Sequence, residues 1–446
     1  MRKKLLTLLI GVSLILALVA VPLMTACTPS DTPETPEVPE TPGVPETPGA
    51  PETPGAPKEP KTVKIAILSA LSGPAASYGL FGLYGMELWA DTVNDAGGIQ
   101  AGGDTYLVEI IGYDSEWMAP KAVTGAKKLV LEDEVTLIHM LGGADVQAAA
   151  PFLTEQGIPF TTLSIGDISP EYPYLFAGAE LSPLAGGTSA DYVARMNPEA
   201  KTVAINNPDG EIYRYYNAYT RVGFEAAGVE VVYNEFWDQM TIDFAPIVTA
   251  MLATDADILS WDAGWGGTSQ LLTEQAFLQG FDGPLHSGVA EIYTDYIART
   301  SEEYMEGYVF FFPDFDDPSL TPAQNAFYAE YQDRHPGEWG AVSWEYAAYM
   351  DIWKYGIEKA GSADSLIVFK ALKAQPQVPH AFGMGTWWGT ELAGIDNILI
   401  APWPTVEIQS GKATIVEMAD LLGWYNKNSD QVISYLEAEG FMWYQQ

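Results

Sequence analysis

The sequence has few of the residues from which catalytic and metal sites are most often built. It holds one cysteine, Cys27, and four histidines in 446 residues. A single thiol excludes a disulfide bond within this sequence. The histidines stand in four separate segments without the spacing of metal ligands, at His139, His286, His335 and His380. We therefore expect no metal site.

Motifs of nucleophilic and phosphate-transfer enzymes are missing as well. No Gly-x-Ser-x-Gly turn presents a nucleophile, and no glycine-rich loop has the pattern of a phosphate-binding loop. These absences predict a protein that is not an enzyme, with no catalytic residue and no cofactor.

Basic residues are scarce. The chain has 21 Lys and Arg against 59 Asp and Glu, which gives a formal net charge of −38. Such a surface repels nucleic acid and anionic lipid, so we expect neither as a partner. The net charge does not identify a ligand, because a local pocket can oppose the global field.

The N-terminus predicts export. A basic start and a long apolar run are typical of a signal peptide, which we place at residues 1–26. Cys27 directly follows two small residues and resembles the lipidated cysteine of a bacterial lipobox, with Met24 in place of the more usual leucine. The alternative is an uncleaved membrane anchor with a bystander cysteine. Residues 27–60 repeat Pro, Glu, Thr and Gly and predict a stiff tether that serves as a passive spacer.

From residue 61 onward, strand and helix patterns alternate twice. The first series opens with "VKIAILSA", "YLVEIIGYD" and "VTLIHML", and the second with "KTVAINN" and "VEVVYNEFW". Such alternation predicts an α/β protein with two Rossmann-like lobes and mainly parallel sheets. Ligands of open α/β sheets bind outside the carboxyl ends of the strands, so we expect a cleft between the lobes.

Several segments carry a resemblance to a known family. They are "LSALSGPAASYG", "GMELWADTVNDAGGI", "VAINNPDGEIYRYYNAYT" and "SWEYAAYMDIWKYGIEKAG". In this order they resemble the leucine/isoleucine/valine-binding proteins, type I periplasmic solute receptors of branched-chain amino acid ABC transporters. The resemblance covers the chain after the tether. It implies lobes joined by a hinge of three strands, near residues 176–181, 310–315 and 383–390.

The resemblance also implies where the lobes begin and end. Residues 61–178 and 315–385 would form the first lobe, and residues 179–314 and 386–446 the second. The stretch from about Met418 goes beyond the family pattern, and we expect it to form helices that pack on the second lobe.

Two turns at predicted strand ends are the first candidates for ligand contact. Ser72 begins a Ser-Gly-Pro turn that leads into a helix, with Tyr78 at the junction. Gly142 and Gly143 follow another strand and precede a helix, where backbone N–H groups favour an anion. Tyr78 covering its turn, and the glycines making a plain turn, are the alternatives.

Further contacts in the first lobe are implied by the resemblance. Tyr78 would pack against the ligand, and the carbonyl group of Ser164 would hold its ammonium group. Gly143 and Gly166 stand where relatives carry hydroxyl groups that hold the ligand carboxylate, so this chain lacks both hydroxyl groups. Ser164 or Asp167 would substitute for them in a rearranged pocket.

In the second lobe the resemblance implies an aromatic wall and an acid. Tyr213 matches a tyrosine at the start of a helix, and Tyr215 or Tyr216 is the alternative after a small change of register. Trp261 and Trp265 stand where the family has an aromatic residue. Strict alignment puts a valine on the acid that pairs with the ammonium, which leaves Glu291 or Asp262 for that role. Five tryptophans lie near predicted strand ends or a hinge, about half of them expected in the core: Trp117, Trp261, Trp265, Trp387 and Trp388.

Together these residues predict a monomeric extracytoplasmic lipoprotein on the outer face of the cytoplasmic membrane. It would bind a small organic solute, either an amino acid or an aromatic or apolar carboxylate, and deliver it to a permease and an ATPase on separate chains. Leucine, isoleucine and valine would bind weakly. A sensing receptor of the same fold without a transport role is the alternative, and a neighbouring permease gene would discriminate the two.

Overall fold

The computed structural model describes residues 58–73, 75–178, 183–261, 264, 266–288, 293–310, 312–313 and 315–445. The chain divides into two units, residues 1–56 and Pro57–Gln446, and all the described residues belong to the second. The predicted signal peptide, Cys27 and nearly all of the tether therefore lie outside the described residues. None of the described helices is long and apolar enough to cross a membrane.

The first sheet has nine strands in the order β12-β13-β14-β6-β5-β4-β1-β3-β2. Its centre is parallel, while β2, β12 and β13 pair antiparallel with their neighbours. The strands are β1 (Lys61–Ser69), β2 (Ile99–Ala101), β3 (Asp104–Asp114), β4 (Leu137–Met140), β5 (Phe160–Thr162), β6 (Leu175–Ala177), β12 (Val378–His380), β13 (Gly383–Trp388) and β14 (Ile398–Ile400).

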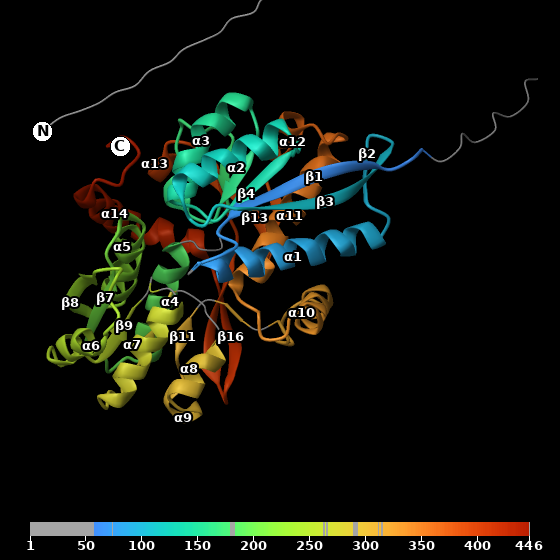
Figure 1. Ribbon diagram of the computed structural model, residues 1–446. Helices are drawn as coiled ribbons and strands as arrows, with labels where there is room; N and C mark the ends of the chain where they lie inside the picture. The colour runs from blue at the N-terminus through green and yellow to red at the C-terminus, as the bar shows by residue number, and fades with distance from the viewer. Residues whose placement is uncertain are drawn as a thin grey trace, which may run out of the picture. The chain divides into compact units, whose positions relative to one another are not determined.

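Helices cover both faces of this sheet, and sheet and helices together are called the first lobe. On β1, Ile65 and Ile67 share a cluster with α1 and α11, whereas Ala66 and Leu68 face α2 and α3. Figure 1 shows α1 on the opposite side of β1 from α2. The helices are α1 (Ala76–Asp95), α2 (Ala119–Leu131), α3 (Ala144–Gln156), α10 (Pro322–Arg334), α11 (Ala341–Ala360), α12 (Ser365–Lys373), α13 (Thr390–Ala393) and the 3₁₀ turn η1 (Ile165–Asp167).

The second sheet has seven strands in the order β16-β15-β11-β10-β9-β7-β8, and with its helices it is called the second lobe. Helices α4 and α5 pack on one face and α6 and α7 on the other. The strands are β7 (Thr202–Pro208), β8 (Glu230–Trp237), β9 (Ile258–Ser260), β10 (Leu285–His286), β11 (Val309–Phe310), β15 (Trp403–Gln409) and β16 (Lys412–Ala419). The helices are α4 (Pro183–Met196), α5 (Glu211–Ala226), α6 (Ala245–Leu252), α7 (Gly266–Leu278), α8 (Tyr293–Arg299), α9 (Glu302–Met305) and α14 (Leu421–Glu439).

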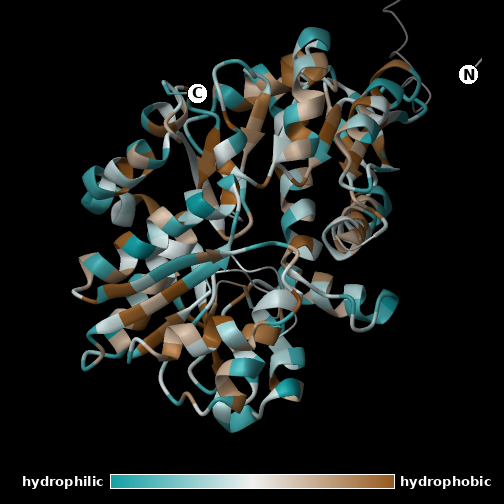
Figure 2. Cartoon of the chain, turned by 60° about the vertical axis from the view of Figure 1, so that its left-hand side comes forward, coloured by the Kyte–Doolittle hydropathy of each residue, from teal (hydrophilic) through white to brown (hydrophobic). Residues whose placement is uncertain are grey.

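The central strands are buried on both faces, and this explains why their apolar runs could be recognised in the sequence. The core of β1 is a continuous apolar run, as expected for a parallel strand covered by helices on each side. In Figure 2 the apolar colour lies largely on strands and the polar colour on outer stretches of helix. The architecture is the α/β class predicted from the sequence, with two mixed, mainly parallel sheets.

The chain crosses between the two sheets three times. It passes from β6 to α4, returns between β11 and α10, and passes again between β14 and β15. The third crossing differs from the predicted one at residues 383–390. Of those residues, Gly383–Trp388 form β13, which pairs with β12 and β14 in the first sheet, so residues 386–400 do not join the second lobe. The hairpin of β12 and β13 has no counterpart in the alternating pattern that guided the prediction.

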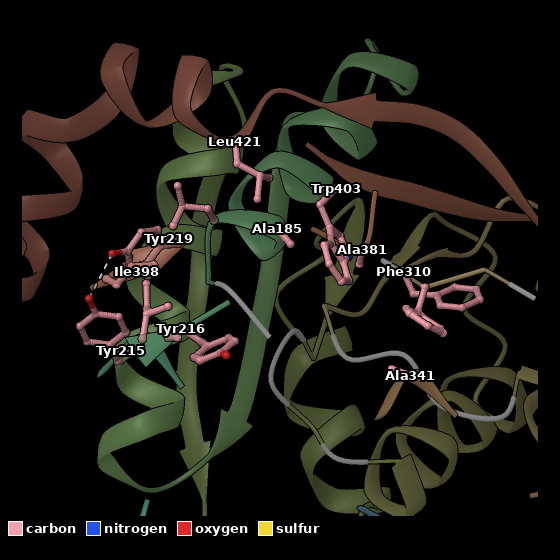
Figure 3. Packing of buried hydrophobic residues seen from close by; sticks show 14 of the residues in the cluster. Ala185, Tyr215, Tyr216, Tyr219, Phe310, Ala341, Ala381, Ile398, Trp403 and Leu421 are labelled. Atoms are coloured by element: carbon pink, nitrogen blue, oxygen red, sulfur yellow. Dashed lines mark hydrogen bonds between the residues drawn. The ribbon is translucent and has the colours of Figure 1, made fainter. Parts of the chain in front are cut away.

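The C-terminal segment forms the end of β16 and then α14. This helix packs on α4 and α5, and Tyr435 donates a hydrogen bond of 2.6 Å to Glu225 of α5. It also reaches the first lobe, since Tyr425 donates 2.8 Å to Glu391 of α13. Figure 3 shows Tyr215 and Tyr219 of α5 beside Ile398 of β14, within a cluster that includes residues of both lobes.

Candidate functional site

The candidate site lies where four parallel strands of the first sheet end. In the register of the sheet, Ser69 is opposite Asp114, and Leu68 is opposite Met140. His139 of β4 is in turn opposite Thr161 of β5. The loops that follow β1, β3, β4 and β5 therefore meet at one edge, which is where open α/β sheets bind ligands.

Asp114, at the end of β3, fastens the turn that follows β1. Its carboxylate accepts hydrogen bonds from the backbone N–H of Leu71 at 2.9 Å, from the hydroxyl of Ser72 at 2.6 Å and from the N–H of Glu116 at 2.9 Å. Burial raises the pKa of Asp114, but these hydrogen bonds outweigh it and the pKa is lowered overall. The Ser72 hydroxyl, predicted to contact ligand, is thus engaged in holding its own turn.

The start of α1 packs directly on this turn. Tyr78 lies in the first turn of α1, partly buried against the first-lobe core. A Cβ on Gly79 would lie 2.0 Å from the carbonyl oxygen of Ala70, so only glycine allows the helix to come this close. The Tyr-Gly pair of the sequence motif therefore fixes the helix, and with it Tyr78, next to the strand end.

A second acid lies in the first turn of α3. The hydroxyl of Ser115 donates 2.5 Å to Oδ2 of Asp145. Asp145 is buried, which raises its pKa; the bond from Ser115 opposes this rise and the charge of Asp114 adds to it. Trp117 adopts a left-handed backbone with φ of 56° and is 41% exposed, and its N–H donates 3.2 Å to Ser115 Oγ. Trp117 thus offers an open aromatic surface beside the strand ends.

Asp167 connects the loop after β4 with the loop after β5. Its Oδ2 accepts the backbone N–H of Gly143 at 3.0 Å and the hydroxyl of Thr162 at 2.7 Å. Its own N–H donates 3.2 Å to the carbonyl of Ser164. Burial raises the pKa of Asp167 to about 6; the bonds from Thr162 and Gly143 oppose this, and the charge of Glu211 adds to it.

The predicted residues of these two loops are therefore brought together. Gly142 is buried, and a Cβ there would lie 3.0 Å from both Asp167 Oδ2 and Thr162 Oγ1. Ser164 is buried and Gly166 is exposed. The backbone carbonyl of Ser164, expected to hold an ammonium group, accepts the Asp167 N–H in this structure.

Sequence reasoning missed Tyr349, which holds the end of β5 from which one of these loops begins. Tyr349 of α11 donates 2.7 Å to the carbonyl of Thr162, and its hydroxyl accepts the N–H of Gly178. Tyr349 is fully buried and lies 4.8 Å, ring to ring, from His139. A tyrosine within an apolar helix carries no local signal of such a contact, because the contact spans 187 residues of sequence.

In the second lobe, Tyr213 and Trp261 have different surroundings. Tyr213, in the first turn of α5, is partly buried, and burial raises its pKa to about 12. Trp261 is 0% exposed, and its indole N–H donates 3.1 Å to the hydroxyl of Tyr308. In this conformation Trp261 belongs to the core and does not line a cleft as expected. Asp262, Trp265 and Glu291 lie outside the described residues.

Two further tryptophans contact neighbouring helices. The indole N–H of Trp387 donates 3.3 Å to the carbonyl of Leu372, and Lys373 Nζ lies 3.9 Å from its ring. Trp388 makes an edge contact with Tyr425 of α14 at 4.8 Å. The ring of Trp387 also lies 6.1 Å from that of Phe176 of β6. Both side chains thus pack against other elements of the protein, which does not support the flat ligand wall predicted for them.

The histidines in the two cores have structural contacts. His139 Nδ1 lies 2.6 Å from the Thr161 hydroxyl, and His286 lies between the hydroxyls of Ser189 and Ser260 at 2.8 and 2.9 Å. Burial lowers the pKa of both histidines to about 3. Within the part of the chain that the structure describes, no group of three or more His, Cys, Asp or Glu side chains is placed to hold a metal ion.

Comparisons with known proteins agree with this architecture. The chain is 26% identical over 324 residues to the leucine-, isoleucine-, valine-, threonine- and alanine-binding protein of Pseudomonas aeruginosa, which covers 70% of this chain and 82% of the relative. A solute-binding protein of an ABC transporter from Rhodopseudomonas palustris, solved with p-hydroxybenzoic acid, has a TM-score of 0.66 at 19% identity and covers 81% of this chain and 99% of its own.

A second solved structure has a different ligand. The branched-chain amino acid transporter substrate-binding protein of Streptococcus pneumoniae, in complex with isoleucine, has a TM-score of 0.65 at 20% identity and covers 79% of this chain and 98% of its own. The model of the family described as periplasmic binding protein matches residues 62–413. The chain therefore belongs to the periplasmic binding protein family and, as its sequence predicted, resembles the leucine/isoleucine/valine-binding members.

Proposed function

We propose that this protein is the extracytoplasmic substrate-binding lipoprotein of an ABC importer. It binds a small organic solute at the strand-end edge of the first sheet and delivers it to a permease. The observation that carries the proposal is the meeting of four strand-end loops, three of them fastened by Asp114 and Asp167, in a member of a family of binding proteins.

Binding would be completed by the second lobe. Tyr213 and Glu211 lie in the first turn of α5, and the charge of Glu211 acts on Asp167 of the first lobe. A ligand that touches both groups of residues at once stabilises the conformation in which the lobes close on it. This gives a permease a way to distinguish the loaded receptor from the empty one.

The proposal includes a lipid anchor and a tether. Cys27 would carry the lipid, and residues 27–60 would hold the binding unit away from the membrane surface. The membrane would be contacted through this anchor only. The permease and the ATPase would be separate chains, and the receptor would act as a monomer.

The two ligand classes raised by the sequence are amino acids and aromatic or apolar carboxylates. The fold accommodates both in other proteins, since one similar structure holds isoleucine and another p-hydroxybenzoic acid. In this chain Gly143 and Gly166 lack the hydroxyl groups that the resemblance implies for amino-acid recognition. We therefore expect leucine, isoleucine and valine to bind weakly.

A screen of solutes tests the proposal. The full chain in detergent is heated with amino acids, amides, aromatic acids and organic amines, and the midpoint of unfolding is recorded. A ligand that binds only the folded state stabilises it by RT ln(1 + [L]/Kd), so this midpoint rises with the logarithm of the ligand concentration once that exceeds the Kd. Hits are confirmed by calorimetry and by uptake into vesicles that carry the cognate permease. Uptake without any need for this protein would leave a sensing role instead, and the absence of any hit would contradict the proposal.

A further inference from the structure

We propose that Asp167 occupies the position at which the first lobe would hold a ligand carboxylate, so that the group of the ligand facing this position is an organic cation. The inference rests on the proposed function, which makes the strand-end edge of the first sheet the binding site. It changes the expected ligand from a carboxylate to an amine.

The backbone N–H group best placed to bind an anion is already in use. The N–H of Gly143 stands just before α3, where the backbone N–H groups of a helix start attract negative charge. This N–H donates to Asp167 Oδ2 at 3.0 Å. The chain thus supplies its own carboxylate where an amino acid or aromatic acid would place one.

Asp167 is held firmly in this position. Thr162 donates to Oδ2 at 2.7 Å, and the same hydroxyl accepts the N–H of Ser164 at 3.1 Å. The backbone of Thr162 is in turn held by Tyr349 at 2.7 Å. Removing Asp167 from this position would leave the hydroxyl of the buried Thr162 and the N–H of the half-buried Gly143 to be paired again, which is costly.

The charges of the aspartates at this edge are not balanced by basic side chains of the described residues. Among the described residues no Lys or Arg forms an ion pair with Asp114, Asp145 or Asp167. The Oδ1 atom of Asp145 is buried without a hydrogen-bond partner among the described residues. Glu211 adds a fourth carboxylate from the second lobe and raises the pKa of Asp167 rather than lowering it. Lys121 of α2 pairs with Glu116 instead. Among the described residues the three aspartates therefore have no basic partner, and a positive group supplied by a ligand would relieve the repulsion.

The basic residue closest to Glu211 on α5 already has acidic partners. Arg214 follows Glu211 by three positions, but it forms ion pairs with Asp209 at 2.9 Å and Glu439 at 3.7 Å, and its guanidinium lies 4.2 Å from the ring of Phe236. Tyr213 lies two residues from Glu211 in the first turn of α5, and the exposed Trp117 bonds to Ser115, the partner of Asp145. Carboxylates combined with aromatic faces are the surroundings that organic ammonium groups prefer.

Matched pairs of small molecules test the inference. Phenethylamine is compared with 3-phenylpropionate, and isopentylamine with leucine, by calorimetric titration of the full chain in detergent. We expect each amine to bind at least tenfold more tightly than its carboxyl-bearing partner. Tighter binding of 3-phenylpropionate or leucine would overturn the inference and leave the receptor function intact.

Variants that remove a single carboxylate test which residues bind the amine. Asp167→Asn should weaken amine binding at least tenfold, and Glu211→Gln about threefold or more, because a neutral amide cannot pair with the ammonium. Glu155→Gln removes the same charge from the exposed far end of α3 and should change nothing. Since Glu211 is exposed, its variant folds even if Asp167→Asn does not. Unchanged amine affinity in the Glu211→Gln variant, or in a folded Asp167→Asn variant, would contradict the inference. Failure of every solute in the wider screen would contradict the receptor function itself.

Discussion

Replacing Gly79 with alanine tests whether α1 must lie against the turn that follows β1. The added Cβ would lie 2.0 Å from the Ala70 carbonyl oxygen, whereas ordinary contact begins at 3.4 Å. The helix or the turn must therefore shift by about 1.4 Å. Overpacking of this kind costs about 1–3 kcal/mol, and the better helix propensity of alanine returns about 1 kcal/mol.

The expected net loss is about 0–2 kcal/mol in the free energy of unfolding. It is measured by urea denaturation followed by circular dichroism, and ligand affinity is measured on the same preparation. Gly267→Ala is the matched control, because this helical glycine of α7 has open space around its Cβ position. The control should be neutral or stabilised by about 0.5–1 kcal/mol. If Gly79→Ala were as stable as Gly267→Ala and bound ligand equally well, the close approach of α1 would not be needed.

Three further predictions follow from the anchor, the aromatic contact and the buried histidines. Cys27→Ser should release the protein from membranes, and a variant that stays bound after signal cleavage, shown by fractionation, would reject the lipobox. Tyr78→Ala should weaken solute binding about tenfold or more with little change in fold, since it removes one aromatic contact; an unchanged Kd in calorimetry would remove Tyr78 from the site. His139 and His286 have folded-state pKa values of about 3, below the ordinary 6.5, so the unfolded chain takes up protons first. Their contribution to stability is complete above pH 6.5 and is lost as the pH falls toward 3. His286→Gln should weaken this dependence in urea denaturation between pH 7 and pH 4.5, and an unchanged slope would count against it.

The sequence was most informative where a pattern repeats over a whole element. Strands such as β1 and long helices such as α11 are buried over most of their length, so their apolar runs and spacings are visible. The third crossing was misplaced because β13 returns in a hairpin. Local propensity cannot show whether such a hairpin joins the first sheet or the second.

The candidate site was predicted in part. Its loops were found because a turn at a strand end carries a clear signature of glycine, serine and proline. The direction of a side chain beyond a strand end carries no such signature, so Trp261 was expected in a cleft and is in the core. The roles of Asp114 and Asp167 were also hidden, because their partners come from other loops that only the folded sheet brings together.

Hydrogen–deuterium exchange on the full chain, with and without the tightest ligand from the screen, tests the central claim most directly. The account predicts that ligand slows exchange in the loops after β1, β3, β4 and β5 of the first lobe, and at the start of α5 in the second. Protection should appear in both lobes at once, because the ligand would be held between the Asp167 loop and α5. Protection confined to one lobe, or to segments away from these strand ends, would contradict the proposed site.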